Sequence, residues 1–178
     1  MRINTLKITL QERALVDISF NIDKSLALVG QSGSGKSLTL KALLKMLPDS
    51  MECSLDYDAD FKLIAGDTVS FVPQNPFTAL SPLTKITKQF FITQERKKDL
   101  FRQVGLDPIL LDRFAPELSG GQLQRVVIAM ALEANPKLIL LDEPTTALDP
   151  QTKSVIIKLL KELQEKMGFK MLFVTHDI

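Results

Sequence analysis

One stretch of eight residues has the composition of a loop that binds phosphate. It follows a short apolar run and reads Gly30-Gln31-Ser32-Gly33-Ser34-Gly35-Lys36-Ser37. Glycines let backbone N–H groups turn inward around an anion, and a helix starting at Lys36 directs its N-terminal dipole at the same point. Lys36 adds a full charge for the β- and γ-phosphates of a nucleotide, and Ser37 offers a hydroxyl to Mg²⁺. The pattern predicts a nucleotide site.

Two acidic residues stand at the end of another apolar run. Residues 138–141 have the composition of a buried parallel strand, and Asp142 and Glu143 follow at once. Ligands of open α/β sheets bind beyond the carboxyl ends of the strands, where these side chains would emerge. We therefore expect Asp142 to hold Mg²⁺ through water and Glu143 to polarise an attacking water molecule.

A second glycine motif begins another predicted helix. Ser119, Gly120, Gly121 and Gln122 offer small side chains, free N–H groups and a hydroxyl at the helix start, a combination that suits an anion. The phosphate loop already serves the nucleotide of this chain, so the second motif has no phosphate of its own. We expect it to contact the nucleotide of a partner subunit.

Composition excludes several classes of function. The 178 residues carry 22 basic and 21 acidic side chains, a net charge of +1, so no nucleic-acid partner is expected. One cysteine and one histidine exclude a disulfide framework and a metal site with two histidine ligands. No run approaches the ~18 apolar residues of a membrane span, and the first ten residues do not read as a secretory signal. We expect a cytoplasmic protein, or one peripheral to the cytoplasmic side of a membrane.

The elements that must position these residues alternate along the chain. Strands are predicted at residues 3–9, 15–22, 26–29, 53–61, 69–72, 138–141 and 171–174, and helices at 36–47, 120–132 and 156–167. Residues 75–118 depart from this alternation, with prolines at the start and many charged residues after them. Helical spacing at 85–104 predicts a helical insertion there. Alternation of strands and helices implies an α/β fold with a mostly parallel sheet covered by helices.

Over residues 15–177 the sequence resembles the ATP-binding cassette (ABC) ATPases. Residues 30–37 match the family's Walker A loop, 138–143 match its Walker B strand, and 118–122 read LSGGQ, the signature motif that defines the family. Three further motifs match in order, namely the Q-loop at Gln74, the D-loop at Ala147-Leu148-Asp149, and the switch histidine His176 before Asp177. The resemblance implies a P-loop NTPase fold, in which an N-terminal antiparallel β portion and an inserted helical lobe accompany the mostly parallel sheet.

The resemblance also implies how the chain is divided. We expect a single ABC ATPase domain over residues 1–178, with a core at 1–74 and 119–178 and a helical subdomain at about 75–118. Family members continue for several more elements beyond the switch histidine, so the C-terminal end is expected to be incomplete.

Roles at the site follow from the same resemblance, with ATP and Mg²⁺ as the cofactors. Ser37, Gln74 and Asp142 would organise Mg²⁺. Glu143 would be the catalytic glutamate and His176 would contact the γ-phosphate. The signature residues would reach the γ-phosphate of a second cassette, either an identical chain or a paralogue.

One segment narrows the branch of the family. Residues 73–82 read PQNPFTALSP, which is similar to a segment of the oligopeptide, dipeptide and nickel importer ATPases. The resemblance implies an ATP-hydrolysing subunit that powers such an importer and binds transmembrane permease subunits. Its place would be peripheral, on the cytoplasmic side of the inner (plasma) membrane. We expect a docking groove for a short permease helix beside Gln74, from exposed apolar residues at Phe77, Leu80, Leu83, Ile86, Phe90 and Phe91.

One departure and two alternatives stay open. The family places an aromatic residue upstream of the Walker A loop to stack on adenine, but residues 6–15 hold no Phe, Tyr or Trp. One alternative is a non-transport ABC ATPase acting in DNA repair or translation. The other is a regulatory nucleotide-binding subunit with weak hydrolysis.

Overall fold

The computed structural model describes residues 1–146 and 148–176, which form two β-sheets and the helices around them. The antiparallel sheet has the order β2-β1-β4, from β1 (Arg2–Leu10), β2 (Arg13–Asn21) and β4 (Glu52–Asp58). The parallel sheet has the order β3-β7-β6-β5, from β3 (Ser25–Val29), β7 (Lys170–Thr175), β6 (Leu138–Asp142) and β5 (Val69–Val72). The α-helices are α1 (Lys36–Leu43), α2 (Gln94–Gln103), α3 (Gly120–Ala131) and α4 (Pro150–Met167). The α/β fold class, with its parallel sheet and N-terminal antiparallel portion, is confirmed.

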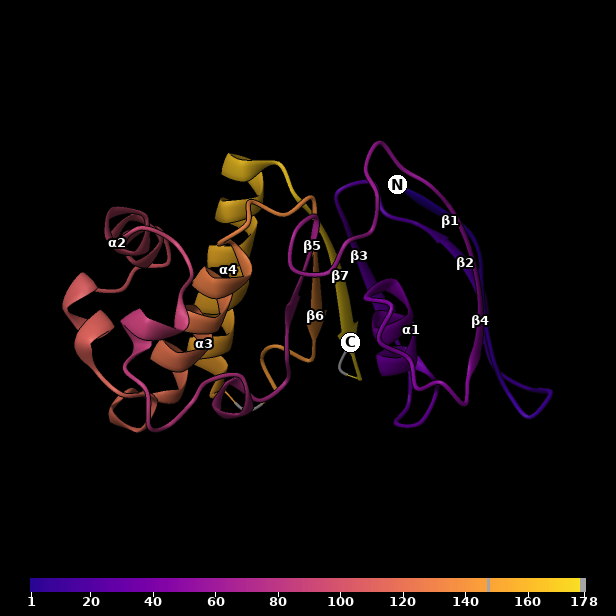
Figure 1. Cartoon of the computed structure of the whole chain (residues 1–178), viewed down its shortest axis with the longest axis horizontal. Coiled ribbons are helices and arrows are strands. Elements are labelled where there is room, and N and C mark those ends of the chain that lie inside the picture. The colour runs from indigo at the N-terminus through magenta and orange to yellow at the C-terminus, as the bar shows by residue number, and fades with distance from the viewer. Residues whose placement is uncertain (147, 177–178) are drawn as a thin grey trace.

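The helices cover the two faces of the parallel sheet unequally. Helix α1 lies between the parallel and antiparallel sheets, whereas α3 and α4 lie on the opposite face, with α2 beyond them (Figure 1). The arrowheads of β6 and β7 point to the same edge of the sheet, and β3 leads from this edge into α1 (Figure 1). The phosphate loop and the strand-end acids are therefore brought to one edge by the topology alone.

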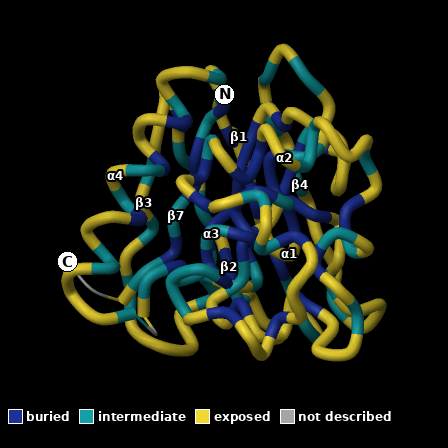
Figure 2. Tube along the Cα trace, turned by 90° about the vertical axis from the view of Figure 1, so that its left-hand side faces the viewer, coloured by how far each residue is buried: buried dark blue, intermediate teal, exposed yellow. Residues whose placement is uncertain are grey.

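Alternate residues of β6 pack into two separate hydrophobic cores. Leu138 and Leu140 join the core around α1 and the antiparallel sheet, whereas Ile139 and Leu141 join the core around α3 and α4. All four side chains are 0% exposed, as a strand covered on both faces requires. Figure 2 shows buried residues running through the interior beneath an exposed outer trace.

Residues 75–118 hold less regular helix than the sequence predicts. The helix expected from residue 85 begins at Gln94, because Thr93 is its N-cap and accepts from the backbone N–H of Arg96. Before it lies the 3₁₀ helix η2 (Ile86–Gln89), and three more 3₁₀ helices complete the segment: η1 (Pro76–Thr78), η3 (Pro108–Asp112) and η4 (Ala115–Glu117).

Two other helix boundaries also differ from the prediction. Helix α1 ends at Leu43 rather than residue 47, since Lys45 adopts a left-handed φ of 56°. Helix α4 begins at Pro150 rather than residue 156, since Asp149 caps it by accepting from the N–H groups of Gln151 and Thr152. Both ends are set by local capping, which hydrophobic spacing does not reveal.

The apolar surface expected after Gln74 is only partly exposed. Phe77, Leu83 and Phe91 are 56%, 88% and 93% exposed. The expectation is wrong for Leu80, Ile86 and Phe90, which are buried in the core around α3. Among the described residues, none of the helices combines the length and apolar character that crossing a bilayer requires.

Candidate functional site

The phosphate loop between β3 and α1 is shaped by two left-handed glycines. Gly33 and Gly35 have φ of 81° and 88°, a conformation that other residues adopt only at a cost. A Cβ at Gly35 would lie 2.5 Å from Cγ2 of Val16 and 3.3 Å from the carbonyl oxygen of Leu15. Strand β2 therefore packs directly under the loop and fixes where helix α1 starts. Gly35 is the N-cap of α1, and no side chain caps the first N–H groups, which suits an anion.

Lys36 turns back over the loop. Its Nζ donates to the carbonyl oxygens of Gly30 and Gln31, at 2.6 Å and 2.8 Å. Ser34 closes the same turn, with its N–H donating to the carbonyl of Gln31. The ammonium group is thus held over the loop, where a phosphate would meet it.

Asp142 faces Ser37 across the site. The Ser37 hydroxyl lies 3.5 Å from Oδ1 of Asp142. Burial raises the pKa of Asp142, and the hydrogen bond from Ser37 opposes that rise. A hydroxyl and a carboxylate at this distance are oxygen ligands of the kind that Mg²⁺ takes alongside nucleotide phosphates and water.

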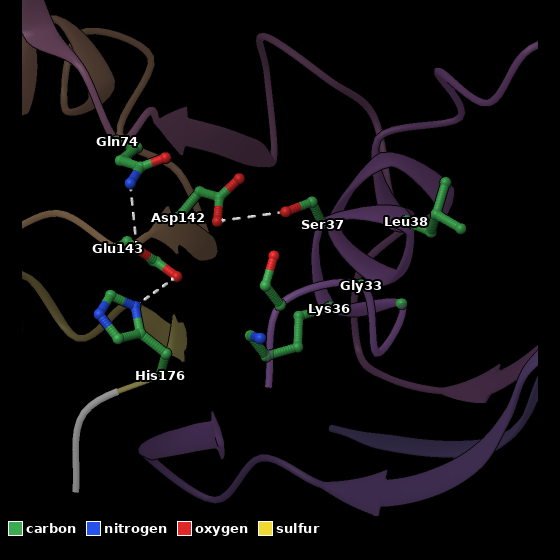
Figure 3. A pocket seen from close by; sticks show the side chains of 10 residues that line it. Gly33, Lys36, Ser37, Leu38, Gln74, Asp142, Glu143 and His176 are labelled. Carbon is green, nitrogen blue, oxygen red and sulfur yellow. Dashed lines mark hydrogen bonds and ion pairs between the residues drawn. The ribbon is translucent and has the colours of Figure 1, made fainter. Parts of the chain in front are cut away.

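Three side chains converge on Glu143: Gln74 and His176, from distant parts of the chain (Figure 3), and Thr146, three residues further on. Nδ1 of His176 lies 2.8 Å from Oε1, while Nε2 of Gln74 and the hydroxyl of Thr146 donate to Oε2 at 3.0 Å and 3.1 Å. The hydrogen bond from His176, aided by that from Thr146, holds the pKa of Glu143 below its usual range. Glu143 also has a left-handed φ of 45°, a strained conformation for a side chain of this size. The carboxylate is therefore ionised and held in one orientation.

These groups line one cavity of about 550 Å³. Its lining residues are Ser32, Gly33, Gly35, Lys36, Ser37, Leu38, Gln74, Asp142, Glu143 and His176. The sequence-predicted loop, strand-end acids, glutamine and histidine thus meet in one place. Gly30, Gln31 and Ser34 shape the loop behind them. The donor set is of oxygen and amide groups, and no cluster of three or more His, Cys, Asp or Glu side chains occurs among the described residues.

The signature residues lie apart from this cavity. Ser119, Gly121 and Gln122 border a second cavity that also includes Arg125 and Thr152. Gln122 and Ser119 form a capping box at the start of α3, each side chain bonding the backbone of the other. Gly120 is the first residue of the same helix.

Close packing explains one glycine of the signature segment. A Cβ at Gly121 would lie 2.9 Å from Cγ2 of Thr152, so the segment packs closely on α4. In the D-loop, Asp149 caps α4, while Ala147 lies outside the described residues, as does Asp177 after the switch histidine.

Sequence reasoning missed Thr146. Its hydroxyl bonds the Glu143 carboxylate, and its N–H donates to the Glu143 carbonyl at 3.2 Å. The spacing of three residues around Pro144 is typical of a turn, and this signal could have indicated the contact.

A groove with a mainly apolar lining lies beside β5, the last strand in the order of the parallel sheet, and we call it the β5 groove. It is bordered by the end of α1, by β5 with Pro73, by η1 and by α3. Its lining residues are Leu44, Met46, Ala65, Gly66, Val69, Ser70, Phe71, Pro73, Thr78, Ala79, Val127, Met130 and Ala131. The groove begins where the chain leaves β5 toward Gln74.

Comparison with known proteins identifies relatives of this architecture. The chain is 36% identical over 196 residues to the oligopeptide transport ATP-binding protein OppD of Bacillus subtilis (strain 168), covering 93% of this chain and 54% of that protein. It is 33% identical to the dipeptide transport ATP-binding protein DppD of Lactococcus lactis subsp. cremoris (strain MG1363), covering 93% of this chain and 56% of that protein. The chain thus spans little more than half of these relatives.

Solved structures agree with the fold. The ATP-binding cassette MJ0796, in a dimeric post-hydrolysis state bound to ADP and Pi, superimposes with a TM-score of 0.75 at 29% identity, covering 99% of this chain and 88% of that one. cbiO1 from Clostridium perfringens, part of the ABC transporter complex cbiONQ, superimposes with a TM-score of 0.78 at 26% identity, covering 99% and 78%. The family model described as "ABC transporter" matches residues 15–146. On this match and these relatives, the chain belongs to the ABC transporter family.

Proposed function

We propose that this chain is the ATP-binding and hydrolysing subunit of a transporter, of the type that imports peptides or nickel. The observation that carries the proposal is the single cavity in which the phosphate loop, the strand-end acids, Gln74 and His176 meet. The cargo class follows from the relatives, whose names specify oligopeptide and dipeptide transport.

We expect the phosphate loop to hold ATP in the cavity. The N–H groups at the start of α1 and the Lys36 ammonium would bind the phosphates, and Lys36 would exchange its bonds to Gly30 and Gln31 for bonds to phosphate oxygens. Ser37, Asp142 and Gln74 would hold Mg²⁺, which when bound neutralises charge on the phosphates. The division into a core at 1–74 and 119–178 and a helical subdomain at 75–118 is part of the proposal.

Hydrolysis is assigned to Glu143. Its carboxylate is ionised and fixed by three side chains, so it is suited to orient or deprotonate a water molecule in line with the γ-phosphate. His176 would contact the γ-phosphate once Glu143 and His176 separate. Phosphoryl transfer depends mainly on positioning and charge stabilisation, and both are properties of this arrangement.

A second cassette completes the site. Ser119, Gly121 and Gln122 lie outside the phosphate cavity and border a cavity of their own, which supports a role toward another subunit's nucleotide. The related cassette MJ0796 forms a dimer in its post-hydrolysis state. We propose the same kind of pairing here, with an identical chain or a paralogue.

The β5 groove is proposed to receive a helix of the transmembrane permease. Its lining is largely apolar, and the exposed Phe71 and Phe77 lie in it and beside it. The groove and Gln74 share the segment after β5, so movement at the nucleotide would reach the permease. This assignment would keep the chain peripheral, on the cytoplasmic face of the inner (plasma) membrane.

Nucleotide binding tests the proposal directly. We expect the parent protein to bind ATP with Mg²⁺ in isothermal titration. Lys36→Ala should bind at least about a hundredfold more weakly, since one charged donor in such a site contributes roughly 3 kcal/mol. Lys41→Ala is the matched control, because Lys41 is exposed on the same helix and removes the same charge. Equal binding by Lys36→Ala and Lys41→Ala would contradict the assigned site.

A further inference from the structure

The amide of Gln124 is buried without a partner for its nitrogen. The residue is 1% exposed, and its Nε2 finds no hydrogen-bond acceptor among the residues that the structure describes. Buried polar groups almost always have partners, because an unpaired buried donor costs free energy. Methionine would fill a similar space without that cost. The glutamine therefore calls for a reason beyond packing.

Gln124 belongs to a helix that packs against the elements on either side of the segment that carries Gln74. Helix α3 runs opposite to the strands of the parallel sheet, so its first turns lie near the carboxyl edge of that sheet (Figure 1). The helix contacts both β5 and η1, which flank the segment on either side. By helical spacing Gln124 shares a face with Val127 and Ala131. Those two residues line the β5 groove together with Pro73 and Thr78.

The segment has a reason to move when nucleotide binds. Gln74 donates from Nε2 to Glu143 at 3.0 Å, and in the proposed function its amide oxygen would bind Mg²⁺, which would draw the side chain toward the metal. A shift of Gln74 displaces the residues next to it, which pack against α3 through η1. Such a shift would change the position of the backbone carbonyls of residues 73–76 relative to Gln124.

We infer that Gln124 is a positioning residue for Gln74. Its Nε2 donates to a backbone carbonyl of residues 73–76 when the segment takes its nucleotide-bound position. Without nucleotide the Nε2 donor of Gln124 is unpaired among the described residues, and in the nucleotide-bound arrangement it is hydrogen-bonded. The free energy of this hydrogen bond therefore favours the nucleotide-bound arrangement. The inference rests on the proposed nucleotide site and adds a residue to the transmission between that site and the β5 groove.

Gln124→Met separates this role from a purely structural one. The variant removes the unpaired donor, so the melting temperature without nucleotide should rise. It also removes the bond gained on binding, so the dissociation constant for Mg·ATP should rise roughly tenfold. A residue that only packs would give neither this pair of opposite effects nor any change specific to ATP. Gln103→Met, at the half-buried end of α2, is the matched control and should change neither quantity.

A double-mutant cycle tests whether the effect passes through Gln74. In a Gln74→Ala background, Gln124→Met should no longer weaken ATP binding, because the segment is no longer drawn to the nucleotide. The inference is overturned if Gln124→Met leaves ATP affinity at the parent value, or if the loss is the same in the Gln74→Ala background. A parent protein that binds no ATP would remove the proposed function as well, which distinguishes the two failures.

Hydrogen exchange of the parent protein provides a test that needs no variant to fold. Addition of Mg·ATP should change the protection of amides in residues 74–79 and in the first turns of α3 together. Protection that changes at the phosphate loop but not in residues 74–79 would overturn the inference.

Discussion

Gly33 and Gly35 offer a matched pair of substitutions in the phosphate loop. Both have left-handed φ, at 81° and 88°, so replacing either with alanine carries a similar backbone cost of about 1 kcal/mol. They differ in the space around them. A Cβ at Gly33 meets nothing within 4 Å, whereas one at Gly35 would lie 2.5 Å from Cγ2 of Val16.

At Gly35 the steric clash should cost more free energy than the backbone conformation does. Val16 is 6% exposed and belongs to the core around α1, so it has little room to give way. Overpacking of this kind costs about 1–3 kcal/mol. We therefore expect Gly33→Ala to lower the free energy of unfolding by about 1 kcal/mol and Gly35→Ala by about 2–4 kcal/mol.

Urea unfolding of the nucleotide-free protein measures both values without interference from bound ligand. Combining Gly35→Ala with Val16→Ala should recover part of the loss, since the atom that clashes is removed. The close packing of β2 under the loop would be refuted by equal losses for Gly33→Ala and Gly35→Ala.

Four further predictions concern the site and its partners. Glu143→Gln should bind ATP like the parent but stop phosphate release and accumulate a nucleotide-bound dimer in size-exclusion chromatography; normal turnover would move the base elsewhere. Without an upstream aromatic to add about 1–3 kcal/mol of stacking, ATP and GTP titrations should give similar affinities, and a preference above about a hundredfold would mean that another residue stacks on the base. Phe71→Glu, in the β5 groove, should abolish transport and co-purification with the permease while ATP binding persists; Phe91→Glu, exposed outside the groove, is the control, and co-purification of both would place docking elsewhere. His176→Ala removes the hydrogen bond that lowers the pKa of Glu143. In the parent this bond adds stability above the ordinary glutamate pKa, and the gain disappears as pH falls through the lower folded-state pKa. As the pH is lowered, the urea midpoint of the variant should therefore fall less steeply than that of the parent. An equally steep fall would contradict the coupling between His176 and Glu143.

The nucleotide cavity was predictable because its chemistry resides in short contiguous patterns. The phosphate loop and the strand end at Asp142 need only local sequence to be identified, and parallel topology brings both to one edge. Apolar runs likewise predict the central strands of the sheet. A strand that is buried on both faces, such as residues 138–141, is apolar at every position, and the sequence shows this directly. Their identification needs no knowledge of distant contacts.

The inserted segment was less predictable because its structure depends on tertiary contacts. Ile86 and Phe90 are apolar in sequence, and only packing into the core shared with α3 and α4 decides that they are buried rather than exposed. The start of α2 is decided by a cap at Thr93, although the charged helical spacing extends further upstream. Positions 122 and 124 both carry glutamine, but the structure uses them differently. Gln122 caps a helix, whereas Gln124 is buried without a partner for Nε2 among the described residues. The pattern of residue types does not distinguish the two.

The alternation along β6 has a consequence for how the molecule unfolds. Because neighbouring residues of one strand supply the two cores on opposite faces, neither core can lose its packing without exposing the apolar wall of the other. Loss of either side therefore withdraws support from both, and the two cores should melt as one cooperative unit. Calorimetry should give a single transition with equal calorimetric and van't Hoff enthalpies. A substitution in the α3 and α4 core would then lower protection from hydrogen exchange in the antiparallel sheet, although no side chain near that sheet had changed.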